Sequence, residues 1–575
     1  MKQWMIKSNH ADLSKIAARY KISEILAEVL VKRGLYDWEA MDTYLYPSMD
    51  KLHDVHAIYD LDHAVSIIRN KIENNQKIQV IGDYDVDGVM STSILVKGLR
   101  KLGAEVSWRV PHRERDGYGV RDYMAREAFE QDVDTIITCD NGISAVDAVA
   151  CAKELGMTVI VTDHHDVPLD NETGQELLPP ADAVVDLKRK DNMYPWRELC
   201  GAAVAYRLIE ALFEGREESA FLDELLSMAA VATVCDVVPL QSENRIIVSR
   251  GLELIQNSTN KGLSSLIRQL DLNRDVDSGV IGFRIGPCIN AAGRLQDAST
   301  GVELMLAEDH KEADAIAAHL IELNEERKDI TARATEQAVK QIEEEGYLDQ
   351  NVLVVFVEEC PESVAGIVAG RIKEKYYRPT MILTRSGDHL KGSGRSIPGY
   401  HMQQELNACA SLLLEYGGHA MAAGFSLKEE KLESLRDALN ERCRLTPKDL
   451  IEKITIDREV ALAEVSGNLV RELNLLQPNK GALFAKRGLE ILSVKIRGKE
   501  GQVGSFMVRD QGRRYNLVDF QIDQCMKKEI CAKYSEAVWE SLEQGNASGC
   551  VMDIIYIPRI NERYGELQYT IVDCR

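Results

Sequence analysis

The sequence predicts an α/β protein of several domains, one of which is built on a doubly wound parallel sheet. Between residues 78 and 185, short runs rich in Val, Ile and Thr alternate with segments of helical spacing. The chain has 575 residues, which is enough for three or four domains with cores of their own. Acidic residues directly follow several of the apolar runs, and in a parallel sheet such positions meet at the edge where ligands bind.

The elements and domains follow in chain order. The expected strands are 78–82, 106–110, 135–139, 158–162 and 183–185, and the helices between them are 89–102, 121–130 and 144–155. Residues 1–60 are expected to be a segment of short helices, and 61–305 the domain that contains the parallel sheet. Residues 306–345 are expected to form a connecting helix, because His310–Glu345 is charged on most sides and lacks Pro and Gly.

The rest of the chain predicts two further domains. Residues 346–446 begin with another apolar run and contain two Gly-rich strings, which indicates a second α/β domain. Residues 447–575 are β-rich with turn signals, and a small barrel such as an OB-fold is expected there.

Composition narrows the class of protein. The formal net charge of −23 argues against non-specific coating of long duplex DNA, although a local basic groove could still bind phosphate. The 12 cysteines include no CxxC pair, which favours a reducing compartment over a disulfide framework or a zinc finger. The N-terminus lacks the apolar core of a signal peptide, and no run of about 18 apolar residues occurs. A cytoplasmic protein with no membrane contact is therefore expected.

Four acidic patches stand where apolar segments end. They are Asp83-Tyr84-Asp85-Val86-Asp87-Gly88, Asp140 in TCDNG, Asp163-His164-His165, and Asp236 in TVCDVVPL. Each patch alone has a commoner structural explanation, as a turn, a helix cap or a helix end. Together they offer six carboxylates and two imidazoles at one cleft, which is what a pair of hard divalent cations requires.

The mixture of ligands indicates which metal and which chemistry. Carboxylate with imidazole suits manganese or magnesium better than zinc or copper, and an EF-hand is excluded because no Glu stands at the twelfth position of the loop. Two cations roughly 4 Å apart can share a carboxylate, activate a water and clamp a phosphate ester.

Eight strings in a fixed order identify the family. They are VIGDYDVDGVMSTSIL, PHRERDGYGV, TCDNGIS, VTDHHDVP, ATVCDVVPL, RIGPCINAAGRL, GSGRSIPGYHMQQEL and YGGHAMAAGFSL. The chain resembles the DHH phosphoesterase family, named for the triplet at 163–165, and most closely its bacterial single-strand-specific exonucleases. The resemblance implies that 61–305 is the DHH domain and 346–446 the DHH-associated, substrate-binding domain.

The resemblance also implies roles for individual residues. One cation would be held by Asp83, Asp85 and Asp140. The other would be held by Asp87, Asp140, His164 and Asp236, so that Asp140 bridges the two. His165 would face the scissile phosphate and act in catalysis with Asp140 and His164. The residues implied to bind substrate phosphates are His419, Gly418, Arg395 and Ser393, with Arg113 and Arg294 as further candidates. Tyr84, Tyr118 and Tyr123 could stack bases, and packing in the core or cleft wall would explain each of them equally well.

The implied function is a monomeric exonuclease that uses two Mn²⁺ or Mg²⁺ ions. It would degrade single-stranded DNA from the 5′ end to 5′-mononucleotides, in recombination and repair, with a single-strand-binding protein and a helicase as partners. The 5′ polarity comes from the resemblance alone. Two alternatives stay open: a DHH phosphoesterase of nanoRNA or small nucleotides, and a non-catalytic DNA-binding scaffold. The segment after about residue 446 favours a polymer substrate, and the filled ligand positions argue against a scaffold. The physiological metal, RNA tolerance and processivity are not predicted.

Overall fold

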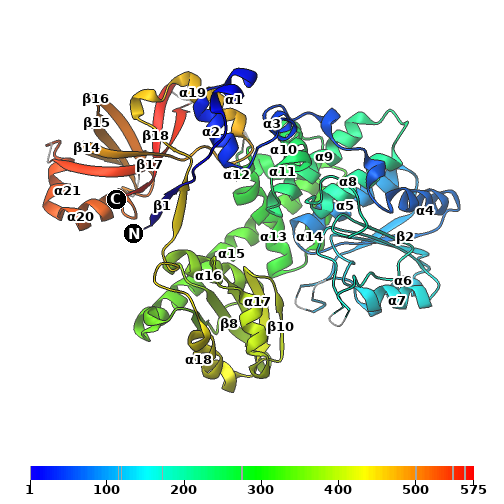
Figure 1. Cartoon of the computed structure of the whole chain (residues 1–575). Coiled ribbons are helices and arrows are strands. Elements are labelled where there is room, and N and C mark those ends of the chain that lie inside the picture. Colours follow the sequence, from blue (N-terminus) through cyan, green and yellow to red (C-terminus); the bar gives the residue numbers. More distant parts are fainter. Residues whose placement is uncertain are drawn as a thin grey trace. The chain divides into compact units, whose positions relative to one another are not determined.

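The computed structural model describes residues 2–113, 115–117, 119–170, 173–272, 276–498, 501–546, 549–561 and 565–575. The chain folds into two compact units (Figure 1). One comprises Met1–Tyr46 and Ile451–Arg575, and the other comprises Pro47–Leu450.

The second unit begins with the predicted parallel sheet. Its five strands lie in the order β3-β2-β4-β5-β6, and every pairing in it is parallel. The strands are β2 (Ile78–Ile81), β3 (Val106–Arg109), β4 (Thr135–Cys139), β5 (Thr158–Asp163) and β6 (Ala183–Asp186). All residues of β2, β4 and β6 are buried, as expected for strands that are covered on both faces.

Two separate cores cover the faces of this sheet. Alternate side chains of the strands pack on one face against α4 (Leu61–Glu73), α5 (Val86–Lys101) and α8 (Gly201–Leu212). On the other face they pack against α6 (Asp122–Glu130) and α7 (Val146–Glu154). The sheet is therefore doubly wound, as predicted (Figure 1).

A group of helices follows the sheet and extends the first of these cores. They are α9 (Ser219–Cys235), α10 (Ser242–Ile255), α11 (Lys261–Gln269), α12 (Ser278–Val280), a π-helical turn at Ile281–Ile285, α13 (Gly286–Leu295) and α14 (Ser299–Leu306). Helix α9 is important for the site because Asp236 is its C-terminal cap residue.

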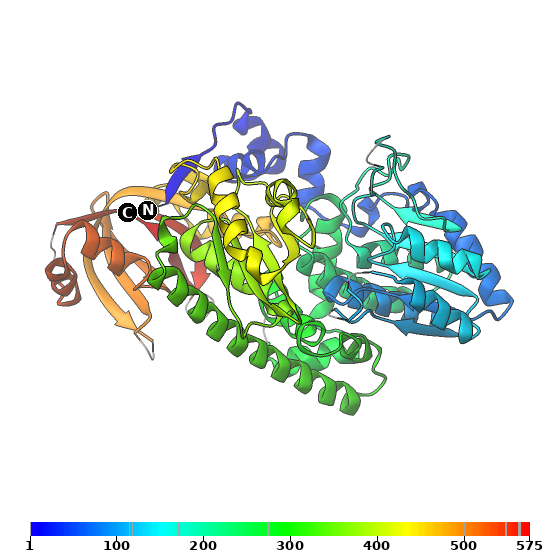
Figure 2. The same ribbon diagram turned by 90° about the horizontal axis from the view of Figure 1, so that it is seen from below.

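The predicted connecting helix is α15 (His310–Glu344), one continuous helix of 35 residues (Figure 2, green). Its buried residues recur every three or four positions along one face. Those in its first half, such as Ala317 and Leu320, belong to the core of the first domain, whereas Ala334, Ala338 and Ile342 belong to the core of the second. The connector is therefore a structural part of both domains.

The second domain has the predicted α/β character. Its five-stranded sheet has the order β10-β11-β9-β8-β7, in which only β7 and β8 are parallel. The strands are β7 (Leu353–Phe356), β8 (Thr380–Ser386), β9 (His389–Arg395), β10 (Glu415–Gly418) and β11 (Ala422–Leu427), and the helices are α16 (Glu362–Tyr376), α17 (Met402–Ala408) and α18 (Leu432–Arg442).

The other unit contains the predicted barrel. Strands β14, β15, β16, β18 and β17 pair in that order, and β17 pairs back to β14, which closes a five-stranded barrel. Their bounds are β14 (Phe484–Arg497), β15 (Val503–Asp510), β16 (Arg513–Asp519), β17 (Cys550–Asn561) and β18 (Glu566–Cys574). A short strand β13 (Arg458–Glu459) and helices α19 (Gly467–Leu473), α20 (Met526–Lys533) and α21 (Glu536–Glu543) complete it.

The N-terminal helices belong to this barrel unit. Helices α1 (Leu13–Tyr20), α2 (Glu24–Lys32) and α3 (Trp38–Leu45) share one apolar core with the barrel strands. Strand β1 (Gln3–Ile6) pairs in parallel with β12 (Lys453–Ile456). The expected segment 1–60 is thus divided: it packs with the barrel up to Tyr46 and with the sheet domain from Pro47. Among the described residues, no helix is both long and apolar enough to cross a bilayer.

Leu30→Ala should destabilise the barrel unit, because Leu30 lies on α2 with none of its surface exposed. The expected loss is about 2–5 kcal/mol of unfolding free energy, measured by urea denaturation. Tyr36→Ala is the control, since Tyr36 is 75% exposed and its truncation should change little. Equal stability of the two variants would contradict the assignment of the N-terminal helices to this core.

Candidate metal centre

The Asp-rich turn after β2 is shaped by a glycine and a helix cap. Asp85 caps α5, and its Oδ1 accepts hydrogen bonds from the backbone N–H groups of Asp87 (2.9 Å) and Gly88 (3.1 Å). A Cβ on Gly88 would lie 2.4 Å from the backbone oxygen of Asp83, so only glycine allows this turn to close. The turn therefore holds three aspartates together at the carboxyl end of β2.

Asp140 directly follows β4 and has a left-handed backbone conformation, with φ of 59°. This conformation is uncommon for a residue other than glycine and is often found at functional sites. The start of α8 packs against it, because a Cβ on Gly201 would lie 2.7 Å from Asp140 Cβ. The same helix start donates to Asp87: the N–H of Gly201 lies 2.6 Å from Oδ2 and that of Ala202 lies 2.7 Å from Oδ1.

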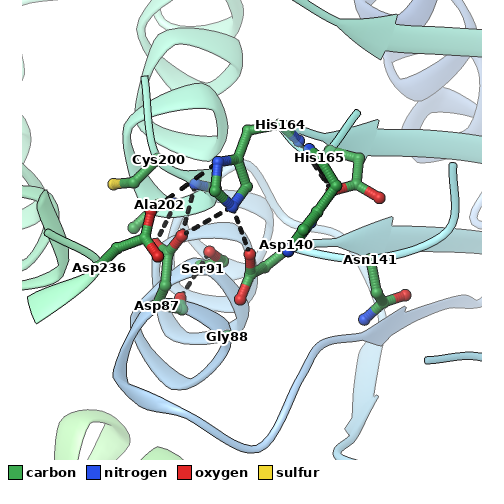
Figure 3. Close-up of polar contacts among 12 residues, drawn as sticks. Asp87, Gly88, Ser91, Asp140, Asn141, His164, His165, Cys200, Ala202 and Asp236 are labelled. Atoms are coloured by element: carbon green, nitrogen blue, oxygen red, sulfur yellow. Dashed lines mark hydrogen bonds and ion pairs between the residues drawn. The ribbon is translucent and has the colours of Figure 1, made fainter. Parts of the chain in front are cut away.

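His164 lies in the middle of the acidic residues (Figure 3). Its Nε2 is 3.0 Å from Asp140 Oδ1 and 3.5 Å from Asp87 Oδ2. Its Nδ1 is 3.9 Å from Asp236 Oδ2. The imidazole thus joins carboxylates from a strand end, a helix start and a helix end.

His165 has a different partner. Its Nδ1 lies 2.8 Å from Oδ1 of Asp163, which is fully buried at the end of β5. The other carboxylate oxygen of Asp163 accepts from the N–H of Ile143 at 2.9 Å. Asp163 therefore orients His165 and is not in any of the groups of potential metal ligands among the described residues.

Three groups of side chains have ligand atoms close enough to share a cation. Their ligand atoms lie within 4.8 Å of one another, and the groups are Asp83 with Asp85 and Asp140; Asp87 with His164 and Asp236; and Asp140 with His164 and His165. Asp140 belongs to two of the groups, as a bridging carboxylate would. All six residues predicted as metal ligands meet at this place.

The carboxylates repel one another in a buried environment. Burial, together with the charge of Asp85, raises the pKa of Asp83 well above its usual range, and burial together with Asp87 does the same for Asp140. Burial and the charge of Asp87 also raise the pKa of Asp236 to about 8. Asp83 Oδ1 is buried without a hydrogen-bond partner among the described residues. These groups fit bound cations, which would supply the missing positive charge.

The two histidines are shifted in opposite directions. Burial lowers the pKa of His164, which favours the neutral imidazole that binds metals. Burial also opposes the charge on His165, but the hydrogen bond and charge of Asp163 raise the pKa of His165 to about 9.

The nearby cysteines do not join the ligand groups. Cys139 Sγ lies 3.6 Å from Thr92 Oγ1, and Cys200 Sγ lies 3.4 Å from Thr233 Oγ1. Burial raises the pKa of both thiols, so they stay protonated. The remaining set of carboxylates and imidazoles suits manganese or magnesium, as expected from the sequence.

Arginines gather on one side of this centre. Arg113 stacks over Tyr84, with its guanidinium carbon 4.0 Å from the ring centre. Burial, and then the charges of Arg113, Arg327 and Arg395, lower the pKa of Arg294 to about 10. Among the residues that the structure describes, none of these four arginines forms a salt bridge. Crowded guanidinium groups that form no salt bridge are an environment for an anion.

A glycine lets α16 approach this arginine cluster, which we define as Arg113, Arg294, Arg327 and Arg395. A Cβ on Gly366 would lie 2.8 Å from Arg395 Nη2 and 2.9 Å from Ser393 Oγ. Arg294 Nη1 donates to the backbone oxygen of Ser363 at 2.6 Å, on the same helix. The cluster therefore combines residues of both domains of this unit.

The remaining predicted residues have different positions. His419 lines a cavity together with His164 and His165, whereas Gly418 is not among the described residues that line it. Gly418 has φ of 142° in β10, and a Cβ there would lie 2.5 Å from the backbone oxygen of Ala422. Tyr123 lies beside Arg109, 5.1 Å from its guanidinium carbon. Tyr118 lies outside the described residues.

Sequence reasoning misses Arg327 and the role of Asp163. Arg327 is one of many charged residues on α15, and only the fold shows that its charge acts on another arginine. The sequence groups Asp163 with the carboxylates at the cleft, and no sequence signal separates a ligand from a residue that orients its neighbour.

Comparison with known proteins agrees with this architecture. Three family models match: the DHH family, N-terminal domain, over residues 77–233; the DHHA1 domain, over 349–445; and the RecJ OB domain, over 456–573. The chain is 36% identical over 483 residues to the single-stranded-DNA-specific exonuclease RecJ of Bacillus subtilis, an alignment that covers 83% of this chain and 60% of that protein. The chain thus spans about three fifths of the length of that relative.

A second relative and a solved structure are similar over more of their length. The RecJ exonuclease of Salmonella typhimurium is 37% identical over 431 residues, which cover 71% of this chain and 73% of that protein. The crystal structure of RecJ from Thermus thermophilus in complex with Mn²⁺ matches with a TM-score of 0.81 and 27% identity, over 100% of this chain and 79% of that one. The chain belongs to the RecJ family of DHH proteins.

Proposed function

We propose that this protein is a metal-dependent exonuclease that degrades single-stranded DNA from the 5′ end and releases 5′-mononucleotides. The observation that carries the proposal is the position of a cation-binding acidic cluster next to an anion-binding arginine cluster in one unit. A phosphodiester bound by metal ions fits both. The relatives named as single-stranded-DNA-specific exonucleases support the choice of substrate.

Each residue set has a proposed role. Asp83, Asp85 and Asp140 hold one Mn²⁺ or Mg²⁺ ion. The other ion is held by Asp87, His164 and Asp236, with Asp140 shared between the two. The ions, when bound, supply an activated water and positive charge at the reacting phosphate. His165, which Asp163 orients, faces that phosphate.

The arginine cluster positions the strand. Arg395 and Arg294 offer planar donors that match phosphate oxygens, and Ser393 adds a hydroxyl. Arg113 lies close enough to Asp83 for its charge to act on that carboxyl. The cluster therefore binds a phosphate next to the one that is cut, and His419 approaches from the cavity side. These contacts fix which bond reaches the metal ligands.

The family resemblance supports further proposals. The protein acts in recombination and repair, is located in the cytoplasm and is a monomer. Its proposed partners are a single-strand-binding protein and a helicase. The barrel, an OB domain by its family model, is proposed to bind single strands outside the active site.

Digestion of labelled oligonucleotides tests the proposal directly. With Mn²⁺ or Mg²⁺, a 5′-labelled single strand should release labelled mononucleotide at once, whereas a 3′ label should stay on shortening fragments. Chelation should abolish both reactions. Release from the 3′ label first would contradict the polarity, and preferred turnover of a dinucleotide would favour the small-substrate alternative. Binding of DNA without any cleavage would favour the scaffold alternative.

Metal binding has a second readout in thermal stability. Mn²⁺ should raise the melting temperature because it offsets repulsion among the buried carboxylates. At a hundredfold excess over Kd, the unfolding free energy should increase by about 2.7 kcal/mol. Asp140→Asn should lose this increase, while its metal-free melting temperature stays at or above that of the wild type. Asp122→Asn, at an exposed position on α6, should keep the full increase. An unchanged increase in Asp140→Asn would contradict the ligand assignment.

Gly366→Ala should separate activity from stability. The new methyl would displace Arg395 and Ser393, so kcat/KM on single-stranded DNA should fall at least tenfold. Helical stability should stay the same or rise, since alanine is favoured over glycine in a helix by about 1 kcal/mol.

Gly370→Ala is a matched control for this variant, one turn further along α16. A Cβ there has no described heavy atom within 4 Å, so activity should be kept. Equal activity of both variants would exclude the arginine cluster from substrate binding.

A further inference from the structure

A cavity of about 340 Å³ lies on the histidine side of the metal centre. His165 and His419 line part of it, and Lys188, Glu198, Leu199 and Val238 line another part. Its volume is at the lower end of the range for small-molecule sites, about 300–1,000 Å³. His165 is proposed to face the phosphate that is cut, and His419 lines the same cavity, so the neighbouring part of the strand is the occupant that fits there.

Lys188 is held beside this cavity by the end of the sheet. It follows β6, and its backbone N–H donates to Asp186 Oδ1 at 2.7 Å. Asp186 is fully buried and lies opposite Asp163, the partner of His165, in the parallel register of β5 and β6. The lysine and the histidine therefore project from adjacent strand ends, and their relative position is fixed by the sheet.

The side chain of Lys188 forms an ion pair in which a phosphate could replace the carboxylate. Its Nζ lies 2.7 Å from Glu198 Oε1, and the two side chains are 22% and 44% exposed. A partly exposed ion pair of this kind contributes little to stability. A phosphate oxygen can thus displace the carboxylate at small cost.

The cavity and the arginine cluster are formed by different residues, since none of the four arginines is among the described residues that line the cavity. Arg113 acts on Asp83 and Asp85, and Arg294 is affected by Asp85. Lys188 instead lines the cavity that His164 and His165 share. A strand that runs from the arginine cluster across the metal ligands would reach Lys188 after the scissile bond.

We propose that Lys188 binds the phosphate on the 3′ side of the scissile phosphate. Glu198 forms an ion pair with this lysine until the strand enters. The sugar and base of that nucleotide lie against Leu199 and Val238. This inference rests on the proposed function, because it takes the arginine cluster as the site of the 5′ side of the strand.

Salt-dependent binding tests it without turnover. A fluorescent single strand protected by phosphorothioate linkages is titrated with protein at several KCl concentrations. Lys188→Met should weaken binding severalfold and reduce the slope of log K against log salt by roughly 0.7, the value for one phosphate contact on a single strand. Lys188→Arg should restore most of the slope. Lys190→Met is the matched control, since Lys190 is exposed and does not line the cavity.

Two further binding tests change Glu198 and the DNA phosphate. Glu198→Gln should tighten binding severalfold, and should have no effect when Lys188 is already Met. A neutral methylphosphonate at the 3′-adjacent position should weaken binding to the wild type and leave Lys188→Met unchanged. A wild-type salt slope in Lys188→Met, or equal sensitivity of both proteins to the methylphosphonate, would overturn the inference.

Cleavage of the unprotected strand is measured in parallel. For Lys188→Met, KM should rise severalfold and kcat should change little. A wild-type protein that binds the strand and releases no nucleotide would refute the proposed hydrolysis, while the salt slope would still decide whether Lys188 contacts a phosphate.

Discussion

The crowding of buried carboxylates at one edge of a parallel sheet is the constraint on which the site depends. Desolvation and mutual repulsion raise the pKa values of Asp83, Asp140 and Asp236, so the cluster is unfavourable without positive charge. Specific backbone features nevertheless hold these carboxylates close together. Asp140 has a left-handed conformation, and Gly88 and Gly201 allow contacts that a Cβ would block. These features hold the ligands in place before any cation binds.

The arginine cluster, a short distance away, brings together positive charges instead of negative ones. Burial, and then the charges of neighbouring guanidinium groups, lower the pKa of Arg294. One cluster requires cations and the other requires an anion, and a metal-bound phosphodiester satisfies both. The two are kept together by α15, because its apolar stripe continues from the core of the first domain into that of the second. Substrate recognition therefore depends on packing well away from the reacting atoms.

The sequence predicts most of the fold, and the residues that it predicts as metal ligands lie close together in the structure. Strand periodicity is local, and the rule that parallel strands present their carboxyl ends at one edge converts local order into proximity for Asp83, Asp140 and His164. Arg327 could not be predicted because its neighbouring arginines come from distant segments. The packing of the N-terminal helices with the barrel is missed for the same reason. The individual roles of His165, His419 and Arg395 remain predictions from the family resemblance.

The barrel unit is built from the two ends of the chain, and this has a consequence for how the protein folds during translation. Strand β1 pairs with β12, and α2 shares its core with strands that begin after residue 480. When α2 leaves the ribosome, the barrel strands that share its core have not yet been made, and the intervening domains are synthesised before them. Its buried leucines, Leu26 and Leu30, must stay covered by other means until translation is nearly complete. Chains that stop early lack the strands that bury this apolar surface.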